Sequence, residues 1–474
     1  MKKITLKKSS FIIKNKEIKE NYIFEGEICQ GSTSIIRKVI HKITQEERVV
    51  KIMQSKRISN KLLFYQEIDK IKELDHTNII KLYEWYEDDK NIYFVTEICK
   101  GGELLMKLEK FGNLSEEIAK KYFIQMISSV NCVHSQNMIL KNLKPEKFLF
   151  DSLDINSSIK LLNLSFPSFF QSTSLGNVTR LKSLFSTDYF EAPEISKGYI
   201  NKSCDIWSCG VILYVLLCGS LPFDGLNSNQ LYELMMQGKI KFQDPDFDKL
   251  SNDAKELLYK MINHPDKRPN GAQILEDKWL KSKGESPFKS NNEINALVKN
   301  IKAYRFSMIF QKAIITYLVT QCNEAEIQDL KNIFYKMDKN HDGYLTFEDI
   351  SIALEKIMTK EEINCYMESI DLNKNDKIDY TEFLASCISS NIILKDEKLI
   401  SCFNIFDKDK NGKISLKEIQ SIIGTDFDAK EEKIISDLLN EFDLDSDGQI
   451  DINEFMKMMF NLKDLQLHLK KSEL

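Results

Sequence analysis

The N-terminal part of the chain alternates apolar and polar residues over short runs. "NIYFVTEI" at residues 91–98 is one such β-rich run, and others occur between about residues 20 and 97. "KLLFYQEIDKIKEL" at residues 61–74 repeats its apolar positions with helical spacing instead. The pattern predicts a small lobe that consists mainly of sheet and contains one helix.

The next part of the chain, from about residue 103 to residue 282, has apolar positions at helical spacing. "EEIAKKYFIQMISSV" at residues 116–130 is an example. "VILYVLLC" at residues 211–218 is apolar throughout, but it is shorter than the roughly 20 residues that cross a bilayer. We therefore expect a buried helix there, within a larger helical lobe.

A linker and a basic amphipathic stretch follow. "GESPFKSNN" at residues 284–292 combines Gly, Pro, Ser and Asn, as linkers do. In residues 294–319, six positions predict much of an apolar helical surface: Leu297, Ile301, Tyr304, Ile309, Phe310 and Ile314. Four positions add basic charge: Lys299, Lys302, Arg305 and Lys312. Such a helix fits a calmodulin-like groove; a helix merely packed between two domains is the alternative.

From about residue 326 the chain repeats itself with a period of roughly 35 residues, and each repeat has an acidic loop between two helical segments. A calcium loop needs oxygens at positions 1, 3, 5, 7 and 9, a carboxylate at position 12 and a sharp turn at position 6. Two loops satisfy this fully. "DKDKNGKISLKE" supplies Asp407, Asp409, Asn411, Ser415 and Glu418, with Gly412 at the turn. "DLDSDGQIDINE" supplies Asp443, Asp445, Asp447, Asp451 and Glu454, with Gly448 at the turn.

The first two loops depart from this pattern at one position each. "DKNHDGYLTFED" supplies Asp338, Asn340 and Asp342 but ends in Asp349, which is one methylene shorter than Glu. "DLNKNDKIDYTE" supplies Asp371, Asn373, Asn375, Asp379 and Glu382 but has Asp376 at the turn, where the left-handed backbone is strained and not forbidden. Position 7 supplies a backbone oxygen, from Tyr344, Lys377, Lys413 and Gln449 in the four loops. Acidic surface loops without metal are the alternative for these segments.

Composition limits the remaining possibilities. The 474 residues exceed what one core supports, and 42% apolar with 29% charged residues is ordinary for globular domains. A net charge of −5 gives no reason to expect a nucleic acid partner. We find no apolar run long enough to be a transmembrane segment, and the 10 Cys lack paired metal spacing, so we expect a cytoplasmic protein.

The expected divisions are 1–21, a basic and solvated tail; 22–280; 281–325, the linker and junction helix; 326–464, the repeats; and 465–474, a C-terminal tail.

Several motifs within residues 22–280 resemble those of protein kinases. "VVKIM" contains Lys51 and "FYQEIDKIKELDH" contains Glu67, "EAPEI" contains Glu194, and "DKRP" contains Arg268. The four repeats resemble the EF-hands of calmodulin. In this order, nearly the whole chain resembles the calcium-dependent protein kinases of plants and protists. The resemblance implies an α+β bilobal protein kinase fold followed by an all-α, calmodulin-like domain of four EF-hands that binds Ca²⁺.

The resemblance also implies roles for scaffold residues. Lys51 would orient nucleotide phosphates and pair with Glu67, although a purely structural ion pair is the alternative. Glu97 and Cys99 follow the gatekeeper Thr96 in the hinge that holds adenine. Glu194 and Arg268 would form a buried ion pair, and Asp205 would hold the backbone of the catalytic loop.

The residues for chemistry depart from the resemblance. The loop that reads H-R-D-x-K-x-x-N in active kinases keeps Lys144, but Asn142 replaces the aspartate base and Lys147 replaces an asparagine that holds magnesium. Losing the base alone is expected to slow transfer by roughly 100- to 10,000-fold. Asn163 occupies the second magnesium-binding position, where active kinases have an aspartate. Only Gly31 remains of three phosphate-loop glycines. We therefore expect poor binding of ATP and Mg²⁺, unless the Lys147 ammonium substitutes for the metal.

These observations favour a calcium-responsive pseudokinase that acts as a scaffold or regulator of a protein partner. In the resembled family the junction helix blocks the substrate groove until the EF-hands bind calcium, so we expect contact between that helix and the EF-hands. An active Ser/Thr kinase is the first alternative, because Glu103, Lys144 and Thr187 match positions that such kinases use. A calcium buffer is the second.

Overall fold

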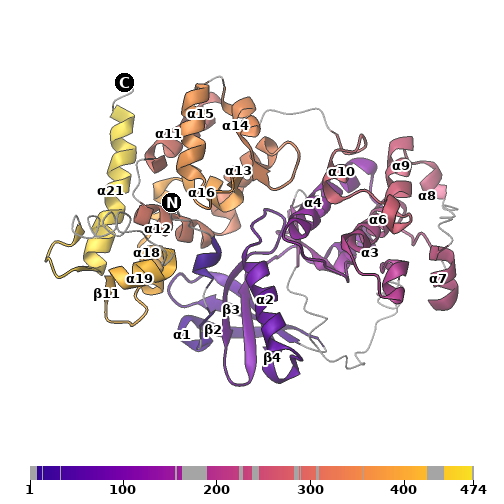
Figure 1. Ribbon diagram of the computed structural model, residues 1–474, viewed down its shortest axis with the longest axis horizontal. Coiled ribbons are helices and arrows are strands. Elements are labelled where there is room, and N and C mark those ends of the chain that lie inside the picture. The colour runs from indigo at the N-terminus through magenta and orange to yellow at the C-terminus, as the bar shows by residue number, and fades with distance from the viewer. Residues whose placement is uncertain are drawn as a thin grey trace.

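The computed structural model describes most of the chain. It covers residues 8–12, 14–15, 17–31, 34–154, 157–162, 189–223, 228–236, 245–281, 288, 290–305, 309–355, 357–423 and 442–471. The predicted fold class is confirmed: two kinase lobes are followed by a helical EF-hand region (Figure 1).

The small lobe is built on a six-stranded sheet with the order β1-β5-β6-β4-β3-β2. Its pairs are antiparallel except for β1, which runs parallel to β5. The helix expected at residues 61–74 is α2, and the Asn60 side chain caps it by accepting the Leu63 N–H. The elements are η1 (Lys8–Phe11), β1 (Lys14–Asn15), α1 (Ile18–Asn21), β2 (Tyr22–Gln30), β3 (Ser34–His41), β4 (Glu47–Gln54), η2 (Ser55–Arg57), α2 (Lys61–Lys72), β5 (Leu82–Glu87) and β6 (Asn91–Thr96).

The large lobe is mainly helical, as expected. Its centre is α6, in which "VILYVLLC" is buried on every side, so the interpretation of that run as a buried helix is confirmed. The elements are α3 (Leu104–Phe111), α4 (Glu116–Ser135), η3 (Pro145–Lys147), β7 (Phe148–Phe150), β8 (Ile159–Leu161), η6 (Pro193–Lys197), α6 (Lys202–Cys218), α7 (Ser228–Met236), α8 (Pro245–Asp248), α9 (Asn252–Met261), η7 (Pro265–Lys267) and α10 (Gly271–Leu275).

The C-terminal region contains the junction helices and the calcium loops. Two short antiparallel ladders join the loops in pairs, β9 with β10 and β11 with β12. The elements are α11 (Asn291–Arg305), α12 (Ile309–Thr320), α13 (Glu324–Met337), β9 (Tyr344–Leu345), α14 (Phe347–Leu354), α15 (Lys360–Ile370), β10 (Ile378–Asp379), α16 (Tyr380–Cys387), α17 (Ser390–Ile393), α18 (Asp396–Phe406), β11 (Lys413–Ser415), α19 (Leu416–Ile423), β12 (Gln449–Asp451) and α21 (Ile452–Lys471).

The junction helices are part of the core of the EF-hand region. Leu297, Ile301, Tyr304, Phe310 and Ile314 are all buried in one apolar cluster with the EF-hand helices. Polar contacts extend the same packing into both EF-hand pairs: Asn300 Nδ2 donates to Cys387 O at 2.7 Å, Lys312 Nζ to Ser369 O at 2.9 Å, and Gln311 Nε2 to Met458 O at 3.2 Å. A separate apolar cluster spans the two kinase lobes.

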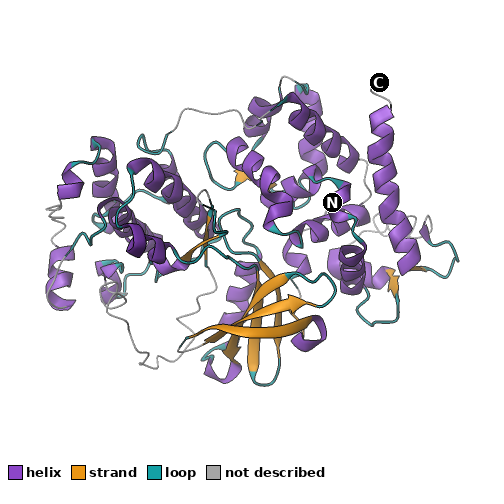
Figure 2. Ribbon diagram, turned by 180° about the vertical axis from the view of Figure 1, so that it is seen from behind, coloured by secondary structure: helices purple, strands orange, loops and turns teal. Residues whose placement is uncertain are grey.

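The EF-hand region lies above the small-lobe sheet and beside α4 of the large lobe (Figure 1). Seen from behind, the sheet lies between two groups of helices (Figure 2). The expectation of a solvated N-terminal tail is wrong for the described residues before residue 22, because Phe11, Ile12 and Ile18 are buried. Their apolar side chains find partners in both the kinase lobes and the EF-hand region.

Candidate calcium and nucleotide sites

The four acidic loops share one backbone arrangement. In each, the carboxylate at position 1 accepts the N–H of position 6: Asp338 from Gly343 at 2.9 Å, Asp371 from Asp376 at 3.0 Å, Asp407 from Gly412 at 2.9 Å, and Asp443 from Gly448 at 2.7 Å. The N–H of position 5 also donates to that carboxylate. These bonds fold each loop around the carboxylate at its first position.

The turn at position 6 is left-handed in all four loops. Gly343, Gly412 and Gly448 have φ values of 87°, 83° and 81°, and Asp376 has φ of 61°. Asp376 therefore adopts the conformation expected for a residue that replaces glycine there. An Asp tolerates this conformation better than most residues do, so the second loop keeps the fold of the others.

Position 12 closes each loop. Glu382, Glu418 and Glu454 accept the N–H of position 2 at 2.8, 2.8 and 2.6 Å. Asp349 reaches the Lys339 N–H only at 3.5 Å. The Asp349 side chain therefore extends less far across the first loop than Glu does in the other three, as expected for a side chain one methylene shorter.

The second pair of loops fits calcium by its donor set. Carboxylate oxygens of Asp407, Asp409 and Glu418 lie within 4.8 Å of one another, and those of Asp443, Asp445 and Asp447 do the same. Hard oxygen donors at this density are what Ca²⁺ prefers, and a bound ion would neutralise their mutual repulsion. Partial burial acts to raise the pKa of Glu418, but hydrogen bonds from Ser415 outweigh this effect and lower it. This ligand position is therefore ionised at neutral pH. The backbone N–H of Gly448 similarly helps to lower the pKa of Asp443 against desolvation.

The first pair of loops packs against the kinase lobes. Ser128 Oγ on α4 donates to His341 O at 2.5 Å, and the Thr381 N–H donates to Asp75 Oδ2 at 2.8 Å. Gly343 lies so close to His76 that a Cβ there would come within 2.5 Å of the imidazole ring. Burial raises the pKa of Asp338 well above its usual range and that of Glu382 to about 8. The same types of oxygen donor are present here, but burial favours the protonated form of these two carboxyl groups.

A lysine at position 7 of one loop reaches the partner loop in both pairs. Lys377 Nζ of the second loop lies 3.5 Å from Asp342 Oδ2 of the first. Lys413 Nζ of the third loop contacts Asp447 of the fourth and lies 3.7 Å from Asp445 Oδ2. Sequence reasoning assigned only the backbone oxygen of these residues to the sites. Their ammonium groups lie beside carboxylates that calcium would need.

The scaffold of the catalytic loop is complete in the described residues. Asp205 accepts the backbone N–H groups of Leu140 and Lys141, each at 2.9 Å. Its carboxylate also contacts His134 Nε2 at 2.8 Å. Arg268 Nη2 donates to Glu194 Oε2 at 2.9 Å, and both groups are buried. The predicted ion pair and the predicted role of Asp205 are confirmed.

Two buried or nearly buried lysines lie beside the catalytic loop. Burial, with the positive charge of Lys144 nearby, lowers the pKa of Lys147 to about 8, and burial with the charge of Lys147 lowers that of Lys51 to about 7. The two lysines therefore lie close enough for the charge of Lys147 to disfavour the charged form of Lys51. Asn142, Lys147 and Glu67 line a cavity of about 30 Å³, and Glu67 Oε2 lies 3.5 Å from Lys70 Nζ on α2. The Lys51–Glu67 pair stays a prediction.

The other predicted nucleotide residues are distributed as follows. The Gly31 N–H donates to Ser34 O at 2.9 Å. Burial raises the pKa of the Cys99 thiol, so the thiolate is disfavoured. Lys144 Nζ lies 3.6 Å from Glu146 Oε1 beside the catalytic loop. Asn163 and Thr187 lie outside the described residues.

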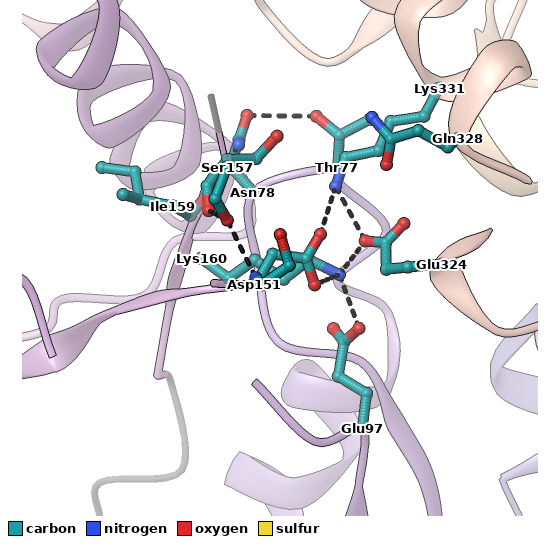
Figure 3. Close-up of polar contacts among 12 residues, drawn as sticks. Thr77, Asn78, Glu97, Asp151, Ser157, Ile159, Lys160, Glu324, Gln328 and Lys331 are labelled. Atoms are coloured by element: carbon teal, nitrogen blue, oxygen red, sulfur yellow. Dashed lines mark hydrogen bonds and ion pairs between the residues drawn. The ribbon is translucent and has the colours of Figure 1, made fainter. Parts of the chain in front are cut away.

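Glu97 lies in an interdomain ion cluster that sequence reasoning missed. Its carboxylate accepts the Lys81 N–H at 2.7 Å and contacts Lys160 Nζ at 2.5 Å. Lys160 also pairs with Glu324, the first residue of α13, while Lys331 Nζ lies 2.7 Å from Glu324 Oε1 and 3.4 Å from Asp151 Oδ2 (Figure 3). Burial acts to lower the pKa of Lys160, but the negative charges of these carboxylates outweigh burial and hold that pKa well above its usual range. The hinge carboxylate therefore belongs to the contact with the EF-hand region.

Apart from Glu97, which matches a hinge position, the members of this cluster belong to no sequence motif, and they are scattered over the chain. Within the described residues, no helix combines the length and the apolar character needed to cross a membrane. The cytoplasmic location and the absence of a nucleic acid partner stay predictions.

Comparisons with known proteins agree with this architecture. The protein kinase domain family matches residues 22–280, and the EF-hand domain pair family matches residues 327–388 and 396–460. Calcium-dependent protein kinase 5 of Plasmodium falciparum is 36% identical over 406 residues, which cover 83% of this chain and 70% of the relative.

Two further relatives extend the comparison. Calcium-dependent protein kinase 5 of Plasmodium berghei is 35% identical over 403 residues, covering 84% of this chain and 71% of the relative. Calcium-dependent protein kinase 3 of Plasmodium yoelii yoelii is 32% identical over 387 residues, covering 81% and 71%. Together with the two kinase lobes and the four calcium loops, these matches show that the chain belongs to the calcium-dependent protein kinase family.

Proposed function

We propose that the chain is a calcium-responsive signalling protein in which EF-hands reposition a catalytically impaired kinase-fold domain. The domain would act as a scaffold or regulator of a protein partner. The observation that carries the impairment is the catalytic loop: Asp205 holds its backbone, yet Asn142 and Lys147 occupy the positions of the base and a magnesium ligand. A neutral amide cannot accept a proton as a carboxylate does.

The packing of the junction helices supports the calcium response. Because α11 and α12 contact both EF-hand pairs, a calcium-driven change in either pair would move the segment that leads back to the large lobe. The ion cluster around Lys160 supplies a second connection, from α13 to the hinge. Both connections lie between the calcium loops and the kinase lobes.

A transfer assay with radiolabelled ATP tests the impairment. The native chain, Asn142→Asp, Lys147→Asn and the double variant would be compared with and without calcium. We expect negligible transfer by the native chain and a gain of activity in the double variant. Robust native transfer that is lost in Lys51→Met would contradict the proposal.

An active calcium-dependent Ser/Thr kinase is the second candidate. It is favoured by the complete scaffold, in which the Glu194–Arg268 pair is intact and Lys144 is retained. The relatives are also named as protein kinases. Phosphoryl transfer depends mainly on positioning and electrostatics, so an intact scaffold alone can support slow transfer. The same assay separates the two candidates.

A further inference from the structure

The segment before the kinase domain contacts two separate cores with two adjacent residues. Phe11 is 3% exposed and belongs to the apolar cluster of the EF-hand region, whereas Ile12 is 4% exposed and belongs to the cluster of the kinase lobes. Figure 1 shows this indigo segment between α12 and the small-lobe sheet. The segment therefore bridges the core of the kinase lobes and the core of the EF-hand region.

The side chain of Phe11 lies in an aromatic socket next to the third calcium loop. Its ring centroid is 5.6 Å from that of Tyr317 on α12 and 6.4 Å from that of Phe406 on α18. Phe310 on α12 also contacts Phe406, with the two ring centroids 5.2 Å apart. Phe406 is the last residue of α18, and Asp407, the first ligand position of the third loop, follows it directly. A change in the angle of α18 would therefore change the socket.

Polar contacts anchor the same segment to the small lobe. Lys8 Nζ donates to Leu74 O at 3.0 Å and to Asp75 Oδ1 at 3.1 Å, and Asp75 in turn accepts the Thr381 N–H of the second EF-hand. β1 then adds a parallel strand to β5, with Lys14 opposite Trp85. Apolar and polar anchors thus fix the segment on both sides.

A second contact joins this segment to the third calcium loop. Lys410 Nζ, at position 4 of the loop, lies 2.6 Å from Glu20 Oε2 on α1. Both side chains are exposed, so this ion pair contributes little stability alone. The ion pair shows that the third loop itself, and not only the preceding helix α18, lies next to the N-terminal segment.

We propose that residues 8–12, 14–15 and 17–21 form a strap that couples the third calcium loop to the small lobe, so that calcium binding and the packing of Phe11 stabilise one another. The proposal deepens the calcium response proposed above and rests on it. The loop carboxylates are converged in the same structure in which Phe11 is seated, so the two belong to one conformation. Linkage requires the effect to be reciprocal.

The test is a calcium titration of the full chain carrying Phe11→Ala, followed by hydrogen exchange of α12, α18 and β5. We expect calcium affinity of the second EF-hand pair to fall about fivefold or more, as typical coupling predicts. Exchange should rise on both sides of the strap. Phe11→Leu should restore most of the affinity, and Phe460→Ala, at a 38% exposed position of α21, serves as the matched control.

Two outcomes would overturn the strap. One is unchanged calcium affinity in Phe11→Ala, and the other is a loss of affinity that Phe460→Ala reproduces. Failure of the proposed calcium response has a different signature: the native chain would bind calcium without any change of exchange in the kinase lobes. The calcium titration measures binding directly. It therefore tests the strap even if calcium causes no change in the kinase lobes.

Discussion

The two EF-hand pairs share a loop fold but differ in their surroundings. In the first pair, Gly343 is packed against His76, and burial raises the pKa of Asp338 and Glu382. In the second pair, a Cβ on Gly412 or Gly448 would meet nothing within 4 Å, and bonds within the loops lower the pKa of Glu418 and Asp443. The same motif therefore serves as a docking surface in one pair and as an open cation site in the other.

This difference predicts that calcium affinity depends on the surroundings of a loop as well as on its ligand pattern. A buried carboxylate must lose its proton before it binds an ion, whereas an open, hydrogen-bonded carboxylate is already ionised. Calcium at the first pair would also act directly on the interface with α4 and His76. The four predictions below test this comparison.

The largest effect is expected from Glu418→Gln combined with Glu454→Gln. Each change removes a carboxylate that closes a loop, so calcium binding by the second pair should fall by more than the roughly 10- to 100-fold that loss of a supporting residue costs a metal site. Most of the calcium-driven change in hydrodynamic shape and protease sensitivity should disappear. Asp349→Asn with Glu382→Gln is the matched pair of changes; an equal loss there would erase the contrast between the pairs.

Gly343→Ala should disturb the docked pair more than Gly412→Ala disturbs the open one. Both alanines pay about 1–2 kcal/mol for a left-handed backbone. Only the first also meets a neighbour, because its Cβ would lie 2.5 Å from the His76 ring. Hydrogen exchange of residues 75–78 should rise only in Gly343→Ala. The same rise in Gly412→Ala would show that the loops do not differ in this way.

Calcium binding by the first pair should strengthen as the pH rises from 6 to 8. Burial raises the pKa of Glu382 to about 8, so below that pH calcium must displace a proton, and affinity falls by up to about tenfold per unit. The Glu418→Gln, Glu454→Gln chain isolates this pair for titration. The second pair, measured in Asp349→Asn, Glu382→Gln, should vary little over the same range. A flat profile for the first pair would remove the electrostatic difference.

The smallest effect is expected from the lysines that cross between loops. Lys413→Gln should raise the calcium affinity of the fourth loop, and Lys377→Gln that of the first, because each removes an ammonium that competes for carboxylates. Exposed ion pairs are weak, so we expect an increase of at most about fivefold. Lys417→Gln, an exposed lysine in the third loop, is the control. Lower affinity in Lys413→Gln would assign that side chain a supporting role.

Local features were predictable from the sequence. The reach of Asp349 and the left-handed turn at Asp376 follow from side-chain length and backbone sterics within 12 consecutive residues. The Glu194–Arg268 pair and the role of Asp205 followed from family motifs that mark a fixed scaffold. Each of these depends on few neighbours or on a fold that the motifs specify.

Contacts between domains were not predictable in the same way. Phe11 and Lys8 occur in a basic N-terminal stretch that resembles a solvated tail, and only the socket at Tyr317 and Phe406 shows that it is packed. Glu97 matched a hinge position, yet its carboxylate is directed to Lys160 and the EF-hand region. A side chain's type limits which partners it accepts, but docking decides which partner is near.

The sequence by itself determined the family, the order of the domains, the four calcium loops and the altered catalytic residues, because these are encoded in short, contiguous patterns. Only the tertiary structure decided that the first EF-hand pair is buried against the kinase lobes and that the N-terminal segment crosses between two cores. The physical reason is that burial depends on surfaces contributed by residues far apart in the chain. Burial in turn sets the pKa of Glu382 and the packing of Phe11.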